Sequence, residues 1–123
     1  MTPLGILLIS GGHERAHYAL VLATGAAALG RPVTLFATHA GLGLLLGAQP
    51  LLRDPREATL AASGVAGIAT LLPAAQELGV ALMACEAGLA AEGLRDAALL
   101  PGVEVAGVVT FLSRTGAGQI LTL

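Results

Sequence analysis

The sequence predicts an α/β fold with a mostly parallel five-stranded sheet and helices on both of its faces. Short apolar runs alternate along the chain with longer runs rich in alanine and leucine, and glycine or proline stands at most of the junctions. This alternation is typical of parallel sheets, because a parallel connection has to cross back over the sheet, usually through a helix. At 123 residues the chain has the length of one compact domain, so we expect a single domain over residues 1–123.

Five apolar runs are expected to form the strands. The first has the sequence LGILLIS and ends in two glycines, a pattern typical of a strand that is buried on both faces and followed by a tight turn. The second, VTLFA, follows Pro32, and the third follows Gly79 and ends at Cys85. The expected strands are, in order, Leu4–Ser10, Val33–Ala37, Val80–Ala84, Val103–Ala106 and Gln119–Leu123.

The longer runs between the strands predict the helices. The first begins at His13 and ends at Gly30, and later ones end at Gly79 and Gly116, because glycine readily adopts the conformation that closes a helix. Residues 47–56 contain two prolines and several charges, so we expect one long loop there. The expected helices are His13–Leu29, His39–Leu46, Ile68–Leu78, Glu86–Gly93 and Gly107–Thr115, with a helical turn at Glu57–Ala62.

The composition favours self-association and disfavours nucleic acid as a partner. Only 11% of the residues are charged and the mean hydropathy is +0.83, so polar side chains are too few to cover a monomer. We therefore expect a homo-oligomer. The net charge is −2, and the six basic residues other than histidine are all arginines, scattered along the chain. Nucleic acid and anionic membrane surfaces are not expected partners.

Segment lengths argue against a membrane span. The uncharged stretch between His17 and Arg31 is shorter than the roughly 20 residues that a spanning helix needs. The longer uncharged stretch at residues 58–76 is interrupted by glycines and Pro73. No basic region precedes the first apolar run, so a secretory signal is not expected. We expect a cytoplasmic protein whose single cysteine stays reduced.

The candidate site residues follow the predicted strands. In an open parallel sheet, ligands bind at the carboxyl ends of the strands, so the loops that follow the strands are the expected site. These loops contain the small, polar and reactive residues Ser10, Gly11, Gly12, His13, Thr38, His39, Cys85 and Glu86. The ligand-binding candidates among them are Ser10, Gly11, Gly12, His13, Thr38 and Glu86.

Cys85 is the only cysteine, and it has two interpretations. It is either a small buried hydrophobe or a reactive thiol. A position at the start of a helix stabilises the thiolate, whereas the negative charge of Glu86 opposes it. His39 is the candidate catalytic partner because imidazole exchanges protons near neutral pH. The alternative, more common for a lone histidine, is that it is only a polar cap on its own helix.

The other candidates also have alternatives. The turn Ser10-Gly11-Gly12 precedes a helix and is suited to bind an anion, or it is simply a tight turn. It lacks the glycine pattern and the lysine of nucleotide-binding loops, so no cofactor is expected. His13 and His17 are one helical turn apart, but no third ligand is evident, so no metal site is expected.

Three segments together carry a family resemblance. The chain contains ISGGHERAHYALVLATGAAALGRPVTLFATHAGLGLLL, then ELGVALMACEAGLAAEGL, then GVEVAGVVTFLSRTGAGQILTL. They resemble, in this order, the first half, the cysteine region and the closing strand–helix–strand unit of DsrE-type proteins. The sequence is therefore similar to the DsrE/DsrF/DsrH superfamily, including the peroxiredoxin-related DsrE type, over nearly its whole length.

The resemblance implies a three-layer α/β/α protein that forms trimers or hexamers. It further implies a sulfur carrier or sulfurtransferase, in which Cys85 holds sulfane sulfur as a persulfide and exchanges it with donor and acceptor proteins. A single cysteine suits this chemistry, because a second nearby thiol would discharge the persulfide as a disulfide. Two alternatives remain: a module that binds a small ligand without turnover, and an oligomeric scaffold subunit in which Cys85 is buried and inert.

Overall fold

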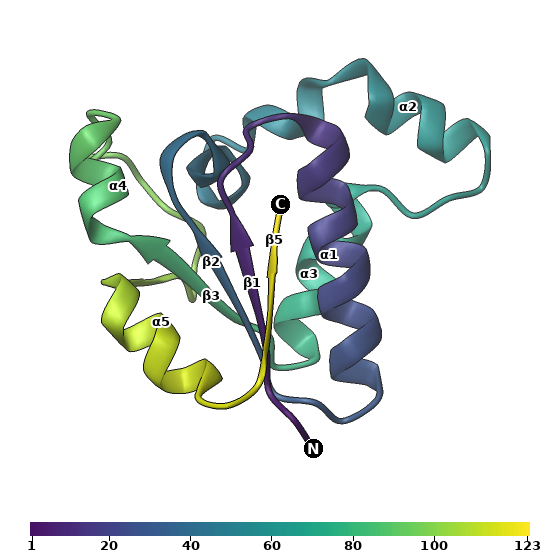
Figure 1. The fold of residues 1–123 in the computed structure, drawn as a ribbon. Coiled ribbons are helices and arrows are strands. Elements are labelled where there is room, and N and C mark those ends of the chain that lie inside the picture. The colour runs from purple at the N-terminus through teal and green to yellow at the C-terminus, as the bar shows by residue number, and fades with distance from the viewer.

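The computed structural model describes residues 1–123 and contains one five-stranded sheet (Figure 1). The strands lie in the order β4-β3-β2-β1-β5, and every neighbouring pair is parallel. The predicted α/β fold with a parallel sheet is confirmed. The strands are β1 Leu4–Leu8, β2 Val33–Ala37, β3 Ala81–Cys85, β4 Glu104–Ala106 and β5 Gln119–Thr122.

Burial explains why the central strands are apolar throughout. All five residues of β2 are buried, as are four of the five residues in each of its neighbours, β1 and β3. A strand covered on both faces has no polar side to display, so its sequence does not alternate. The edge strands β4 and β5 contain no buried residue, and polar side chains return there.

Helices cover both faces of the sheet and complete three layers. On one face, α1 packs against β1 and β2 and also against α3; on the other face, α5 packs against β1 and β2. Figure 1 shows α1 and α3 to the right of the sheet and α5 to its left. The helices are α1 His13–Ala28, α2 Pro55–Ala62, α3 Ile68–Glu77, α4 Glu86–Ala91 and α5 Val108–Thr115. None of them is both long enough and apolar enough to cross a bilayer.

The two faces bury cores of very different size. A cluster of 22 buried residues lies mainly between the sheet, α1 and α3. On the α5 face the buried cluster has only four members, and it includes Phe36 and Phe111, whose rings stack with their centroids 4.9 Å apart. Gly5 lets α5 pack closely on β1, because a Cβ at this position would lie only 2.5 Å from Thr115 Oγ1 of α5. The other two members of the small cluster are Met83 and Cys85.

The segment expected to be one long loop is more ordered than predicted. Residues 47–56 contain a 3₁₀ helix, η2 Pro50–Arg53, and the first residues of α2. Proline favours the first turn of a helix, where its missing N–H needs no partner, and Asp54 caps α2 by accepting the backbone N–H of Arg56 at 2.9 Å. The two prolines therefore begin helices here instead of preventing them. A second 3₁₀ helix, η1 His39–Leu45, follows β2.

Candidate functional site

Cys85 lies where β3 ends and α4 begins. It is the last residue of β3 and pairs in register with Ala106 of β4. It is also the N-cap of α4, and its Sγ accepts the backbone N–H of Gly88 at 3.3 Å. The residue is 8% exposed. The sulfur therefore lies at the start of a helix and accepts one of its backbone amides.

Gly88 is the point at which Thr38, His39 and Cys85 converge. A Cβ built on Gly88 would lie 2.5 Å from Thr38 Oγ1, 3.1 Å from the backbone nitrogen of His39 and 3.3 Å from the Cβ of Cys85. Only glycine allows α4 to approach the end of β2 this closely. The structure therefore brings together the residues that follow β2 and the cysteine that ends β3. This is the arrangement expected if the site lies at the carboxyl ends of the strands.

His39 begins η1 with its side chain exposed to solvent. Its φ is +49°, in the left-handed region that few residues other than glycine adopt. Its imidazole makes no hydrogen bond within the chain. The backbone of His39 thus lies beside Gly88 at this edge, while its ring is exposed to solvent.

The Ser10-Gly11-Gly12 turn lies at the same edge, after β1. A Cβ on Gly11 would lie 2.8 Å from the Cβ of Ala40, so this turn packs directly against the start of η1. Gly12 is the N-cap of α1 and supplies no side-chain cap. No side chain therefore caps the first amides of α1. An anion-binding turn needs such uncapped amides, because the anion takes the place of the cap.

The side chain of His13 is directed elsewhere. It is 3% exposed, and its Nε2 lies 2.6 Å from Oε1 of Glu57. Neither ring nitrogen is hydrogen-bonded to Cys85, and Nδ1 has no partner at all. The His13 ring stacks on that of His17 with their centroids 6.0 Å apart, and His17 Nε2 lies 2.8 Å from the carbonyl oxygen of Ala66. The structure contains no group of three or more potential metal ligands.

Sequence reasoning missed Glu57, which lies 44 positions from His13 in the chain. Burial raises the pKa of the Glu57 carboxyl, but hydrogen bonds from His13 and from the backbone amides of Ile68 and Ala69 outweigh it and hold that pKa below its ordinary value. No local pattern identifies such a pair, because the two residues lie on different helices, α1 and α2, that meet only in the folded chain.

Comparison with known proteins establishes the family. The chain matches the DsrE/DsrF-like family over residues 4–122. This protein belongs to the DsrE/DsrF-like family. Its fold is similar to the crystal structure of the ychN protein from E. coli, with a TM-score of 0.77 and 19% identity, covering 100% of both chains. Comparison with curated protein sequences found no match.

A second solved structure shares the fold more distantly. It is a conserved protein of unknown function from Bacteroides thetaiotaomicron, with a TM-score of 0.56 and 12% identity, covering 97% of this chain and 94% of the other. At these identities both structures support the fold of this DsrE/DsrF-like protein. The family places it in a sulfur-relay-related group.

In this DsrE/DsrF-like protein, an open groove lies between α4 and α5 and includes the residue that follows Cys85. It is lined by residues from the α4 region and by the beginning of α5, among them Glu86, Arg95, Gly107, Val108 and Val109. Glu86 directly follows Cys85, and Gly107 follows the residue that pairs with it. The groove therefore contains the residues that directly follow the paired Cys85 and Ala106 at the ends of β3 and β4.

The wall formed by α5 is tied to the edge strand by an ion pair. Both guanidinium NH groups of Arg114 donate to the carboxylate of Glu104, at 2.5 and 2.6 Å. The hydrogen bond from Arg114 lowers the pKa of Glu104 below its ordinary value. The pair joins α5 to β4 beside the strand that contains Cys85.

Proposed function

We propose that this DsrE/DsrF-like protein is a sulfur carrier or sulfurtransferase that holds sulfane sulfur as a persulfide on Cys85. The observation that carries the proposal is the hydrogen bond from the Gly88 N–H to Cys85 Sγ, at the carboxyl end of a parallel strand. The Gly88 amide contacts the sulfur from within α4, and the same donor is in place when Cys85 is regenerated at the end of the cycle.

The transfer consists of two thiol exchanges. In the first, the Cys85 thiolate attacks the outer sulfur of a donor persulfide, R–S–SH; the new S–S bond forms as the donor S–S bond breaks, and RS⁻ leaves. In the second, an acceptor thiolate attacks the outer sulfur of Cys85–S–SH, and Cys85 leaves as the thiolate. Sulfane sulfur moves from donor to acceptor, and no external oxidant or reductant is consumed.

The neighbouring residues have proposed roles in this cycle. His39, exposed and free of other hydrogen bonds, is the proposed proton donor and acceptor for the entering and leaving thiols. Thr38 and the Ser10-Gly11-Gly12 turn are proposed to bind the reactant at the same edge. His13, the other ligand-binding candidate, has no part in this proposal, because its side chain is buried against Glu57. Glu86 lines the groove beside Cys85 and is proposed to contact the arriving partner.

Intact mass measurement tests the proposal directly. Because Cys85 is the only cysteine, incubating the reduced protein with a low-molecular-weight persulfide should add one sulfur atom to the chain. The added sulfur should be removed by an acceptor thiol and should be absent in Cys85→Ser. The carrier hypothesis fails if the wild-type mass does not change and the Cys85 thiol reacts with a titrant only after denaturation.

A scaffold or ligand-binding subunit with an inert cysteine is the second candidate. It is favoured by the packing of Cys85 in the small cluster with Phe36, Met83 and Phe111, where it is 8% exposed. In that case a small ligand should raise the melting temperature while leaving the mass of the protein unchanged. The mass experiment therefore separates the two functions.

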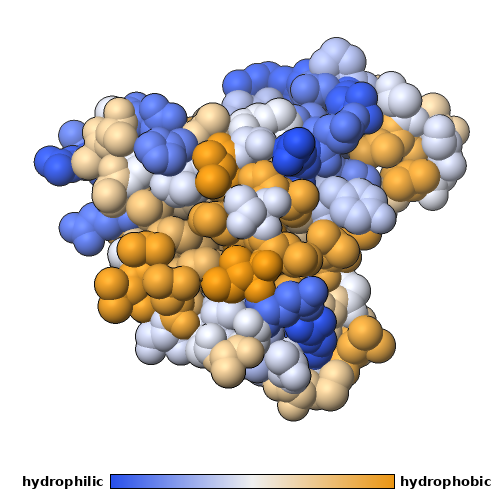
Figure 2. Space-filling model, viewed as in Figure 1, coloured by the Kyte–Doolittle hydropathy of each residue, from blue (hydrophilic) through white to orange (hydrophobic).

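We further propose that copies of the chain associate in the cytoplasm as a trimer or hexamer. Figure 2 shows hydrophobic atoms gathered over α5 and continuing across the middle of the same face. The exposed apolar residues of α5 are Val108, Val109 and Leu112, and Val109 is 76% exposed. An apolar surface of this kind favours protein contact over solvent, and an unpaired cysteine suits a reducing compartment.

A further inference from the structure

The segment that contains α2 extends from the body of the molecule. Figure 1 shows α2 well to one side of the sheet, beyond α1. None of its eight residues is buried. A helix of this length is not stable by itself in water, so its position depends on contacts with the rest of the chain. We call residues 54–67 the α2 arm.

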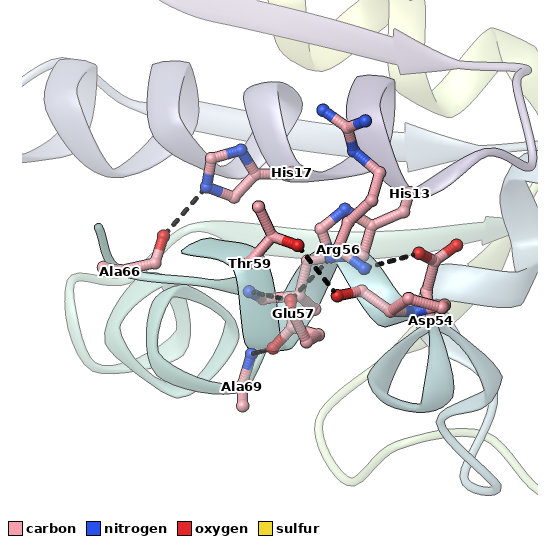
Figure 3. Close-up of polar contacts among 10 residues, drawn as sticks. His13, His17, Asp54, Arg56, Glu57, Thr59, Ala66 and Ala69 are labelled. Carbon is pink, nitrogen blue, oxygen red and sulfur yellow. Dashed lines mark hydrogen bonds and ion pairs between the residues drawn. The ribbon is translucent and has the colours of Figure 1, made fainter. Parts of the chain in front are cut away.

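Glu57 provides the buried attachment of the α2 arm. Its Oε1 lies 2.6 Å from His13 Nε2 and accepts the backbone N–H of Ile68 at 2.8 Å, while its Oε2 accepts the N–H of Ala69 at 3.3 Å (Figure 3). One carboxylate therefore joins α1, α2 and the beginning of α3. The side chains of His13 and Glu57 are 1% and 15% exposed, so this contact is largely withdrawn from solvent.

The N-terminus of α3 has space and free backbone amides for the Glu57 carboxylate. Gly67, the N-cap of α3, has no side chain with which to cap the helix. A Cβ at Gly67 would lie 2.8 to 3.0 Å from atoms of the Glu57 carboxylate, so glycine makes the space that the carboxylate occupies. Glu57 thus serves as the cap that α3 lacks, supplied from the α2 arm.

The remaining polar contacts of the arm are more exposed. Arg56 pairs with Glu14 at 2.9 Å, but the two side chains are 54% and 77% exposed, and such pairs stabilise little. His17 Nε2 contacts the carbonyl oxygen of Ala66 at the far end of the arm. The carboxylate of Asp54 caps α2 itself by accepting the backbone N–H of Arg56. The charged and titratable side chains on this side of the molecule include Glu14, Arg15, His17, Tyr18, Asp54 and Arg56. From α3, Glu57 receives the backbone amides of Ile68 and Ala69.

The hydrogen bond to Glu57 is the only one that the buried ring of His13 makes. The Nδ1 atom of this ring is buried and already lacks a hydrogen bond, so Nε2 is the only ring nitrogen with a partner. If Glu57 left, both nitrogens would be buried without partners, which is costly unless water reaches the ring. Release of Glu57 and hydration of His13 are therefore coupled.

We propose that the α2 arm is an acid-sensitive strap, which opens as a local unit when Glu57 takes up a proton and thereby uncovers His13 and the first amides of α3. A protonated carboxyl no longer offers a charge to its three donors, and charge-assisted hydrogen bonds are the stronger ones. The proposal does not involve Cys85 and stands independently of the proposed sulfur chemistry.

The direction of the pH dependence follows from the contacts of Glu57. Burial raises its pKa, but the bonds from His13, Ile68 and Ala69 outweigh burial, so the pKa is lower in the folded protein than in the unfolded chain. A carboxyl of this kind stabilises the fold at pH values above its unfolded pKa, and that contribution is lost as the pH falls through the folded pKa. The strap is therefore closed at neutral pH and opens only in acid.

Amide hydrogen exchange on the full chain tests the strap. Protection factors, which correct for the intrinsic effect of pH, would be compared for residues 58–69 and for the buried strand β2 between about pH 7 and about pH 3. We expect protection in the arm and at Ile68 and Ala69 to fall by about tenfold or more, while β2 stays protected. Simultaneous loss in both regions would overturn the proposal, because the arm would then not be a separate unit.

A substitution provides the second arm of the test. In Glu57→Gln, the arm should already have lost about tenfold of its protection at neutral pH and should change little on acidification. Glu77→Gln, at the exposed end of α3, is the matched control and should behave as the wild type. Wild-type protection in Glu57→Gln would overturn the proposal, and if that variant does not fold, the wild-type pH comparison decides.

Discussion

At the scale of single residues, the candidate site depends on a glycine as much as on the cysteine. Gly88 donates its N–H to Cys85 Sγ, and the absence of a side chain lets α4 approach Thr38 and His39. Gly88 therefore acts in two ways. Its amide contacts the sulfur, and its lack of a side chain lets the end of β2 lie close to α4. Cys85 was predicted from its position at the end of a strand, whereas the role of Gly88 follows from three-dimensional packing.

Replacing Gly88 with alanine should destabilise the protein. The added methyl group would lie 2.5 Å from Thr38 Oγ1, and alanine's better helix propensity does not compensate for such a clash. We expect the free energy of unfolding to fall by about 1–3 kcal/mol, measured by urea denaturation. The double variant Gly88→Ala with Thr38→Ala should recover part of the loss. Unchanged stability in the single variant would contradict the close approach of α4 to Thr38.

At the scale of elements, the strands and helices differ in how tightly other elements pack against their glycines. Gly5 in β1 and Gly88 in α4 lie where another element approaches within contact distance. Gly25, near the C-terminal end of α1, is exposed, and a Cβ built there has no contacting atom within 4 Å. A sequence pattern does not distinguish these glycines, because crowding depends on the element packed against each of them.

Gly25→Ala should therefore stabilise the protein. Glycine in a helix interior costs about 0.5–1 kcal/mol relative to alanine, and here no steric penalty offsets the gain. We expect an increase of that size in the free energy of unfolding, measured in the same urea titration as Gly88→Ala. The two substitutions form a matched pair of opposite sign. A loss of stability in Gly25→Ala would indicate that another surface, such as a second copy, covers α1 at this point.

At the scale of the whole molecule, the two faces of the sheet are unequally completed. The α1 face buries a cluster of 22 residues, whereas the α5 face buries four and leaves apolar side chains of α5 exposed. Ile120 of the edge strand β5 is also 43% exposed. The high apolar content of the sequence is thus partly displayed on the surface that the proposed oligomer would bury.

Val109→Glu should disrupt that assembly. Val109 is 76% exposed in the first turn of α5, where a carboxylate is tolerated by the helix but opposes burial in an apolar interface. We expect analytical ultracentrifugation to show a shift from oligomer toward monomer. The monomeric variant should still unfold in a cooperative thermal transition. The control is Leu29→Glu, at a 72% exposed position beyond the end of α1. This variant should sediment as an assembly of the same size as the wild type. A monomeric wild type would refute the assembly itself.

Local signals in the sequence determined the elements. Apolar runs bounded by glycine and proline predicted the five strands, their alternation with helices predicted parallel pairing, and the position of Cys85 at a strand end predicted its place at the carboxyl edge. These signals act within a few residues, because strand burial, helix capping and turn formation depend mainly on neighbours in the chain. The error at residues 50–56 arose because proline interrupts a helix but also begins one.

Only the tertiary structure decided which residues meet. The order β4-β3-β2-β1-β5 places Thr38 beside Cys85, and the packing of α1, α2 and α3 joins His13 to Glu57 across 44 positions of the chain. Such contacts depend on strand order and on the distance between packed elements, which no local pattern encodes. The sequence by itself thus determined the fold class and the reactive candidate, and tertiary packing decided the surroundings of Cys85 and the attachment of the α2 arm.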